Sequence, residues 1–326
     1  MKKEKYLKYI IAIIPFIWII VKIEPDKFIH IVNNSSWWTV PLIAVTTCIT
    51  IFIQGFRWWI LIYVKHSNIK FYRAMSFQFI GTFYSIMLPT SFSQDIVRNL
   101  LISKEENFDT VWASTWICRV FGLMSLFVMS SYGLIQYEQL RTLNCLSIIF
   151  ACLALMIIFL FLISFSKTIT YPFRILFEKL LPEKAIHIIT QIRNSIYFYK
   201  RKKKYLLIVF IFTLVMNIST FGAFTFALYG ITGEFHVKEI FSFLPVIDLI
   251  CIIVPITPNG IGLREFLLFN LFQKLNFSEE QAAVFISLNL VIIICRLLGC
   301  FPLIWMNNDI SKKMVLPIPR KLCENT

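Results

Sequence analysis

Residues 253–262 read IVPITPNGIG and residues 87–95 read MLPTSFSQD, so two long apolar runs both end in proline and polar residues. Proline lacks an amide N–H and clashes with the preceding helical turn, which interrupts an α-helix at both places. A break inside hydrocarbon leaves backbone groups unpaired unless protein or water covers them. The two stretches therefore predict re-entrant or broken helices that line a cavity. Ordinary loops outside the membrane are the alternative.

Apolar runs also dominate the rest of the chain. Hydrophobic residues make up 58% of the 326 residues and charged residues 15%, whereas a soluble domain carries about 25% charged residues. A spanning helix needs about 20 mostly apolar residues. Six runs fit, at 7–23, 39–64, 110–135, 143–165, 205–230 and 281–306. The interrupted runs are 74–90 and 239–258, followed by shorter stretches at 96–107 and 261–275. We expect an all-α polytopic membrane protein with a single membrane domain over residues 1–326.

Positive charge indicates how the chain is oriented. The formal net charge is +14, and the basic residues lie between apolar runs rather than on one face, which favours membrane topology over nucleic-acid binding. Basic clusters precede the first run, follow the second, occupy 200–204 and recur in the C-terminal tail. This pattern predicts both termini in the cytoplasm, and Lys-, Ile- and Asn-rich usage suggests the inner membrane of a bacterium. Segment 166–204 reads as an amphipathic cytoplasmic helix or a solvated linker.

The chain contains an internal repeat. In each half an arginine follows a proline nine residues later, Arg98 after Pro89 and Arg264 after Pro255. Residues 117–122 read ICRVFG and residues 294–299 read ICRLLG. We assign one half to residues 1–140 and the other to 143–310. In the predicted topology, the chain enters the broken segment of the first half from the cytoplasmic side and that of the second half from the external side. Such an inverted repeat is typical of transporters that bind substrate between the halves.

Charged residues within apolar segments are the first candidates for a binding site, because each costs about 2.5–3.5 kcal/mol or more to insert. The candidates are Arg57, Asp95, Arg98, Arg119, Asp248, Arg264, Glu265 and Arg296. Arginine suits phosphate oxygens, so converging arginines predict a site for a lipid phosphate. Internal ion pairs are the alternative, Asp95 with Arg98 or Asp248 with an arginine of another helix. Arg57 also lies near enough to a helix end for its side chain to reach the interface.

The turn in the second broken segment adds four candidates. Thr257, Asn259, Gly260 and Gly262 lie just before a predicted helix start. Free backbone N–H groups at such a start bind anions, and glycine allows close approach. No motif of a hydrolase, metalloprotease or nucleotide-binding loop is present, and the eight cysteines and four histidines show no metal-ligand spacing. We therefore expect no catalytic residues, metal or cofactor.

Several of these elements resemble one known family. Arg57, Trp58 and Leu61 are similar to an R-W-x-x-L element, and Pro89, Asp95 and Arg98 fit a P-G-x-x-G-G-D-x-x-R element. Arg119 and Gly122 match D-R-x-x-G, and residues 257–265 resemble T-P-G-G-x-G-x-R-E. These elements belong to the flippase-like family that forms the transmembrane region of lysylphosphatidylglycerol synthases. The chain departs from them at Thr90, Ser93, Gln94, Cys118 and Asn259.

The resemblance implies a stand-alone member without the soluble aminoacyl-transferase domain. Its implied function is translocation of an anionic lipid or a polyprenyl-linked glycan precursor across the cytoplasmic membrane, without enzymatic activity. Two alternatives stay open: a membrane subunit that supports a separate glycosyltransferase or aminoacyltransferase, and an ion or solute transporter. The expected partners are a membrane lipid and a membrane-associated transferase, and no nucleic acid.

Overall fold

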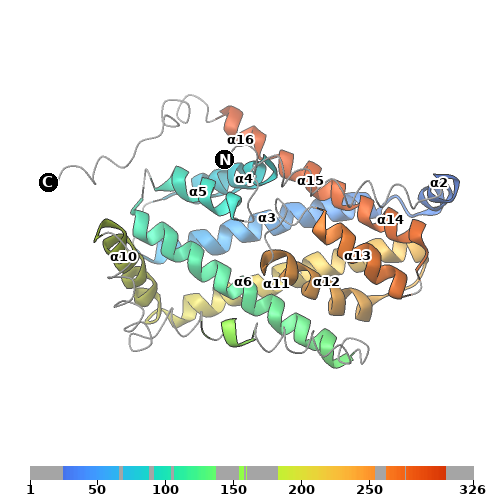
Figure 1. The fold of residues 1–326 in the computed structure, drawn as a ribbon. Helices are drawn as coiled ribbons and strands as arrows, with labels where there is room; N and C mark the ends of the chain where they lie inside the picture. Colours follow the sequence, from blue (N-terminus) through green and yellow to red (C-terminus); the bar gives the residue numbers. More distant parts are fainter. Residues whose placement is uncertain are drawn as a thin grey trace.

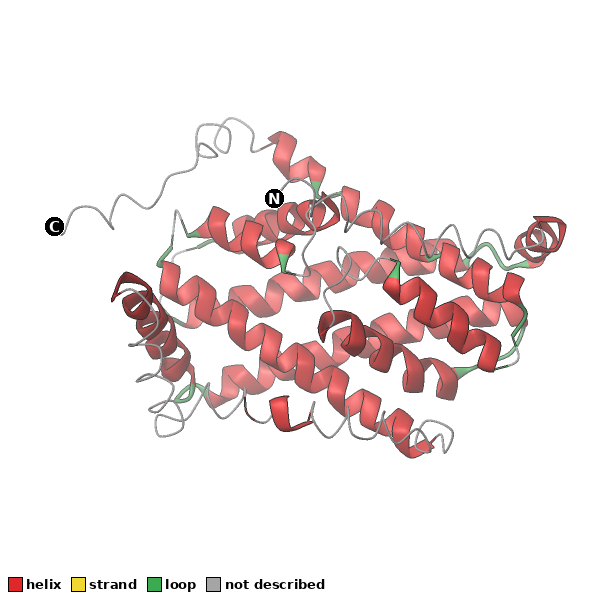
Figure 2. Ribbon diagram, viewed as in Figure 1, coloured by secondary structure: helices red, strands yellow, loops and turns green. Residues whose placement is uncertain are grey.

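A computed structural model describes residues 25–65, 69–87, 92–103, 106–136, 154–157, 159, 183–253, 262–275 and 277–305. Within these ranges every regular element is an α-helix (Figures 1 and 2). Four helical segments are long and apolar enough to cross a membrane, namely Thr39–Val64, Phe108–Tyr132, Lys203–Thr232 and Glu279–Pro302. The expected all-α polytopic membrane protein is confirmed.

The helices follow the predicted runs closely. The long helices are α3 (Thr39–Val64), α6 (Phe108–Gln136) and α11 (Lys203–Thr232), and the last span consists of α14 (Glu279–Ser287), α15 (Asn289–Leu297) and α16 (Cys300–Trp305). Turns at Leu288 and at residues 298–299 therefore interrupt the span that was expected to be continuous over 281–306. Two further helices, α2 (Pro25–Asn34) and α10 (Glu183–Tyr199), lie at opposite ends of the bundle (Figure 1).

Some predicted segments lie outside the described residues. They are the first span at 7–23, residues 166–182 of the expected cytoplasmic segment, the predicted helix breaks at 88–91 and 254–261, and most of the span at 143–165. The single domain and its division at 1–140 and 143–310 therefore stay predictions, as does the position of the termini.

The two central helices, α3 and α11, run antiparallel. The Ser36 N–H donates to the Gly230 carbonyl over 2.9 Å just before α3 begins. Farther along, the Thr50 and Thr220 hydroxyls lie 3.2 Å apart, and Arg57 donates to Thr213 over 2.7 Å. The partner number on α11 falls as the number on α3 rises, which defines antiparallel helices. Equivalent spans of the two halves thus point in opposite directions, as an inverted repeat requires.

A helix pair flanks each of the two predicted helix breaks. In the first half, α4 (Phe71–Met87) precedes the break and α5 (Ser93–Ile102) follows it. In the second half, α12 (Val237–Ile253) and α13 (Leu263–Lys274) take the same places. Helices α4 and α12 are both 17 residues long. The described part of each helix ends two residues before the proline of its half, Pro89 or Pro255, so the predicted interruption itself lies outside the described residues.

The packing of the helices follows the repeat. Helix α6 packs against α12, and its counterpart α15 packs against α4. Likewise α6 contacts α3 as α14 contacts α11, and α5 contacts α6 as α13 contacts α14. Exchanging the halves therefore maps these helix contacts onto one another. Two apolar clusters result, one around Trp58 and Phe77 in the first half and one around Phe224 and Phe285 in the second.

The glycines that end the two ICR-x-x-G motifs differ in their surroundings. A Cβ added to Gly299 would overlap the backbone carbonyl oxygen of Phe79 in α4. A Cβ added to Gly122, the equivalent residue in α6, would have no atom of the described residues outside its own helix within 4 Å. The two halves therefore have the same sequence motif but different packing at this point.

Helix α10 packs against one end of the bundle and is held there by hydrogen bonds. The fully buried Tyr199 hydroxyl donates to the Leu61 carbonyl of α3 over 2.8 Å, and burial raises the pKa of this phenol above its usual range. Lys65 donates to Asp109 over 2.8 Å, and Ser195 of α10 hydrogen-bonds to both residues. These contacts hold α10 against the ends of α3 and α6.

Candidate functional site

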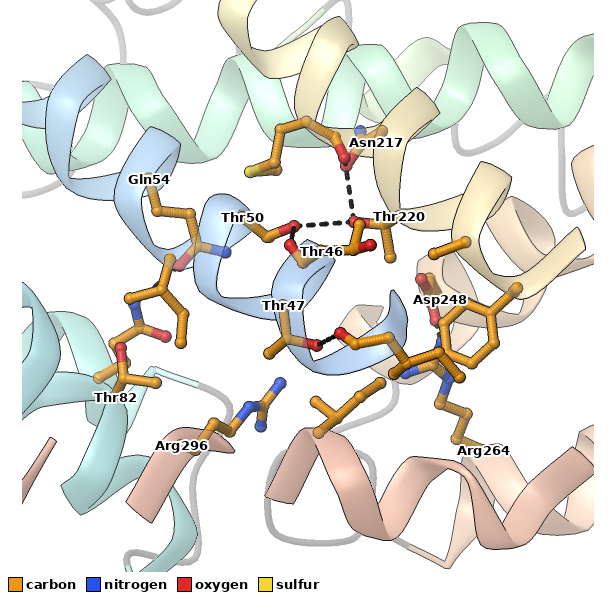
Figure 3. A pocket seen from close by; sticks show the side chains of 17 residues that line it. Thr46, Thr47, Thr50, Gln54, Thr82, Asn217, Thr220, Asp248, Arg264 and Arg296 are labelled. Atoms are coloured by element: carbon orange, nitrogen blue, oxygen red, sulfur yellow. Dashed lines mark hydrogen bonds and ion pairs between the residues drawn. The ribbon is translucent and has the colours of Figure 1, made fainter. Parts of the chain in front are cut away.

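A cavity of about 190 Å³ lies between the halves. Its central walls are α3 and α11 (Figure 3). The first helix pair contributes Thr82 and Gln94, and the second contributes Asp248 and Arg264. Helix α15 adds Arg296, whose side chain extends into the cavity in Figure 3. Helices on both sides of each predicted helix break thus line one common cavity.

Polar side chains at helical spacing run along the two central helices. On α3 they are Thr46, Thr47, Thr50, Gln54 and Arg57, and on α11 they are Thr213, Asn217 and Thr220; all but Arg57 and Thr213 line the cavity. Residues three or four apart share one helix face, so each helix carries a polar stripe. The Thr50–Thr220 and Arg57–Thr213 contacts join the two stripes. The cavity lies along this seam.

The second half brings two arginines and one carboxylate to the cavity. The Arg264 Nε lies 3.2 Å from Oδ1 of Asp248, and its guanidinium carbon lies 5.4 Å from the centre of the Phe224 ring. Among the described residues, Nε and Nη2 of Arg264 are buried without an acceptor in hydrogen-bond geometry. The described part of the chain also shows neither an ion pair nor a side-chain hydrogen bond for Arg296. The cavity therefore holds unused arginine donors.

The first half contains an equivalent charge cluster in which both arginines are paired with a carboxylate. We call it the closed cluster, and the cavity residues Asp248, Arg264 and Arg296 the open cluster. Asp95 forms an ion pair with Arg98 of the same helix, at 2.9 Å, and a second one with Arg119 of α6. The Arg98 side chain is 4% exposed, and its guanidinium stacks 4.0 Å above the Trp58 ring. Here one carboxylate occupies both arginines, because it lies between them.

Glutamines connect the closed cluster to the cavity. Arg98 donates to Gln78 over 2.5 Å, and Gln78 donates to Gln54 over 3.2 Å. Gln94 also donates to Gln54, over 3.0 Å. Both Gln54 and Gln94 line the cavity. A hydrogen-bonded path therefore leads from the closed cluster to the wall of the cavity.

The start of α13 is held by its own side chain. Gly262 has a φ of +88°, a conformation that glycine adopts without strain. Its N–H donates to the carboxylate of Glu265 over 2.6 Å, and Glu265 is 3% exposed. Glu265 therefore caps a helix, and neither residue lines the cavity. Thr257, Asn259 and Gly260 lie outside the described residues.

The structure thus divides the predicted site residues into groups. Asp248, Arg264 and Arg296 share the cavity. Asp95, Arg98 and Arg119 form the closed cluster. Arg57 lies on the α3–α11 seam, where its guanidinium binds Thr213 and its Nε is buried without an acceptor among the described residues. The arginines that follow the predicted breaks therefore belong to two different clusters rather than to one.

Sequence reasoning missed the threonines and amides of the cavity. Thr46, Thr47 and Thr50 lie in a run that reads as uniformly apolar. A signal was nevertheless available, because polar residues in α3 recur every three or four positions and end at Arg57. The same spacing links Thr213, Asn217 and Thr220 in α11.

Length, composition and fold together define a polytopic α-helical membrane protein with a polar cavity between two similarly built halves. Residues 6–295 match the family described as the lysylphosphatidylglycerol synthase TM region, and the chain belongs to this family. Comparison with curated proteins and with solved structures gives no match.

Proposed function

We propose that the protein translocates an anionic lipid, either a phospholipid or a polyprenyl-phosphate-linked sugar, through the cavity between its halves. The observation that carries the proposal is the composition of that cavity. Two arginines and one aspartate line it, and helices from both halves form its walls. Arginine binds phosphate oxygens through paired N–H donors, and the unused donors of Arg264 and Arg296 are available for that role.

The carboxylates act as internal counter-ions in this mechanism. A lipid phosphate replaces Asp248 beside Arg264, which is now paired at 3.2 Å. Asp95 fills the same role for Arg98 and Arg119 in the first half. The arginines are thus never left as isolated buried charges, which would be costly in a low-dielectric interior. The exchange lets the phosphate enter and leave without a large free-energy barrier.

The inverted arrangement suits movement between the two faces of a membrane. Antiparallel α3 and α11 place equivalent helix pairs at opposite ends of a common seam. Rocking of one half against the other around a fixed central site is the usual way such repeats alternate access. We place the protein in a bacterial inner membrane with both termini in the cytoplasm, on the basis of its charge distribution.

The direct test is reconstitution in liposomes with a tail-labelled anionic lipid and a membrane-impermeant quencher. We expect lipid movement well above protein-free liposomes, and strong loss of it with Arg264→Ala. The exposed residue Arg201 supplies a matched control, because Arg201→Ala removes an arginine outside the cavity. Background rates for several anionic head groups, with correctly folded protein, would rule the proposal out.

A further inference from the structure

The threonines of the cavity offer a ligand mainly hydrogen-bond acceptors. Each hydroxyl lies 2.6 to 2.9 Å from a carbonyl one turn earlier in its own helix, to which it donates its single O–H proton, and the Thr50 and Thr220 oxygens also lie 3.2 Å from each other. They are Thr46, Thr47, Thr50, Thr82 and Thr220. A hydroxyl has one proton and two acceptor lone pairs. The oxygens therefore remain as acceptors, and a ligand must bring donors to meet them.

The donors of the cavity are placed differently. Arg264 and Arg296 supply guanidinium N–H groups to the space beside Asp248. The Gln54 Oε1 accepts from Gln78 and Gln94, and in Figure 3 its amide nitrogen is turned toward the middle of the cavity. The cavity thus joins a region of cationic donors to a wall of neutral acceptors. A matching ligand has an anionic group at one end and hydroxyl donors at the other.

The charge of the cavity distinguishes a ligand with hydroxyl donors from a ligand with an ammonium group. An ammonium group would also bond to the threonine oxygens, but it would enter a cavity with two arginines and one carboxylate. That carboxylate, Asp248, is already paired with Arg264 at 3.2 Å. Like charges brought together in a desolvated site cost several kcal/mol. The cavity therefore favours a head group whose donors are uncharged.

We propose that the cavity selects a phosphate joined to a neutral polyol, such as glycerol or a sugar, and excludes head groups that carry an ammonium. This inference rests on the proposed function and names the substrate class of the same site. The phosphate binds Arg264 and Arg296, and the polyol hydroxyls donate to the threonine oxygens of α3 and α11. A volume of about 190 Å³ suits a head group without its acyl chains.

Three tail-labelled lipids of equal net charge test this selection in proteoliposomes. Phosphatidylglycerol offers hydroxyl donors, phosphatidylethanol lacks them, and phosphatidylserine carries an ammonium. We expect phosphatidylglycerol to move faster than phosphatidylethanol by about two- to tenfold for each hydroxyl bound. Phosphatidylserine should be slower than phosphatidylglycerol by more than about tenfold.

A matched pair of substitutions tests the threonine wall. Thr220→Val removes one acceptor from the cavity. Thr225→Val removes a hydroxyl on the same helix that makes the same kind of backbone hydrogen bond, over 3.0 Å, away from the cavity. We expect Thr220→Val to lower the ratio of phosphatidylglycerol to phosphatidylethanol rates by about two- to tenfold. Thr225→Val should leave the ratio unchanged.

The outcomes separate this inference from the proposed function. Equal rates for the three lipids, all well above protein-free liposomes, would overturn the selection and leave lipid translocation standing. Background rates for all three, with no uptake of labelled glycerol phosphate, would overturn both. Uptake of free glycerol phosphate without lipid movement would support the ligand chemistry and refute the lipid as its carrier. A preference for phosphatidylglycerol that Thr225→Val reduces as much as Thr220→Val would refute the role of the threonines.

Discussion

The Nε of Arg264 lies 3.2 Å from Oδ1 of Asp248, so this ion pair joins α12 and α13, the two helices that flank the second predicted helix break. The equivalent arginine of the first half, Arg98, pairs instead with Asp95 of its own helix, at 2.9 Å. Movement of α13 away from α12 therefore breaks the second pair. Movement of α5 away from α4 leaves Arg98 and Asp95 together. The arginine at this repeat position is therefore paired within one helix in the first half and between two helices in the second.

Asp248→Asn should make the site bind anions more tightly and release them more slowly. The substitution removes the carboxylate that competes with a phosphate for Arg264. We expect a lower apparent Kd for a tail-labelled anionic lipid in nanodiscs, together with slower lipid movement in proteoliposomes. Weaker binding by Asp248→Asn would show that the carboxylate holds the arginine in place rather than competing with the ligand.

Asp95→Asn should mainly destabilise the fold. Its side chain is 11% exposed and forms ion pairs with two arginines, so its loss leaves uncompensated buried charge at a cost of about 3–5 kcal/mol. We expect a large fall in Tm in detergent, and a smaller one for Asp248→Asn, because Asp248 is 24% exposed and pairs with one arginine. Equal falls in Tm would contradict this distinction between the closed and open clusters.

Arg296→Ala should impair transport with little effect on stability. The guanidinium makes no ion pair within the described part of the chain, so its removal leaves no carboxylate behind. Charge-assisted hydrogen bonds contribute about 1.5–3 kcal/mol each, which corresponds to about 10- to 100-fold in lipid movement. Arg296→Lys should restore only part of the rate, since lysine lacks the planar fork. A variant with an unchanged rate would remove Arg296 from the site.

Gly299→Ala should be far more disruptive than Gly122→Ala. The added methyl at position 299 meets the Phe79 backbone carbonyl, and such overpacking costs about 1–3 kcal/mol. At position 122 the methyl meets no atom of the described residues outside α6, and replacing a helical glycine by alanine stabilises by up to about 1 kcal/mol. Thermal unfolding of both variants in one detergent measures the difference. Similar Tm values would mean that α4 can shift to accommodate the methyl.

Tyr199→Phe should loosen α10 from the bundle. It removes a fully buried hydroxyl that donates to the Leu61 carbonyl and leaves that acceptor unpaired, at a cost of about 1–3 kcal/mol. Amide hydrogen exchange across 183–199 should become faster, while exchange in α12 and α13 stays as in the unchanged protein. Faster exchange throughout the bundle would show that α10 stabilises the whole fold rather than docking on one end.

The helices could be predicted from the sequence because hydropathy and proline placement are local signals. The expected spans at 39–64, 110–135 and 205–230 correspond to α3, α6 and α11. The interruptions predicted from Pro89 and Pro255 fall within 88–91 and 254–261, outside the described residues, and stay predictions. The turn at Leu288 was not expected, since residues 281–306 contain neither glycine nor proline before Gly299.

The grouping of the charges could be predicted only in part. The Asp95–Arg98 pair follows from residues one helical turn apart. The contact between Asp95 and Arg119 depends on how α5 packs against α6, which no local pattern encodes. Likewise, two nearly identical ICR-x-x-G motifs give no sign that Gly299 is in tight contact and Gly122 is free. Such differences arise from the tertiary arrangement that the molecule adopts.

The unequal surroundings of Gly122 and Gly299 have a thermodynamic consequence. A chain with two similarly built halves has, for any asymmetric conformation, a second one in which the halves exchange roles. In that second state α4 would leave Gly299. The two states differ in free energy through the residues that the repeats do not share, and a ligand shifts the balance between them by its difference in affinity for the two. Residues such as Asp95 and Asp248, which have no counterpart at the matching position, then determine which state the empty protein prefers.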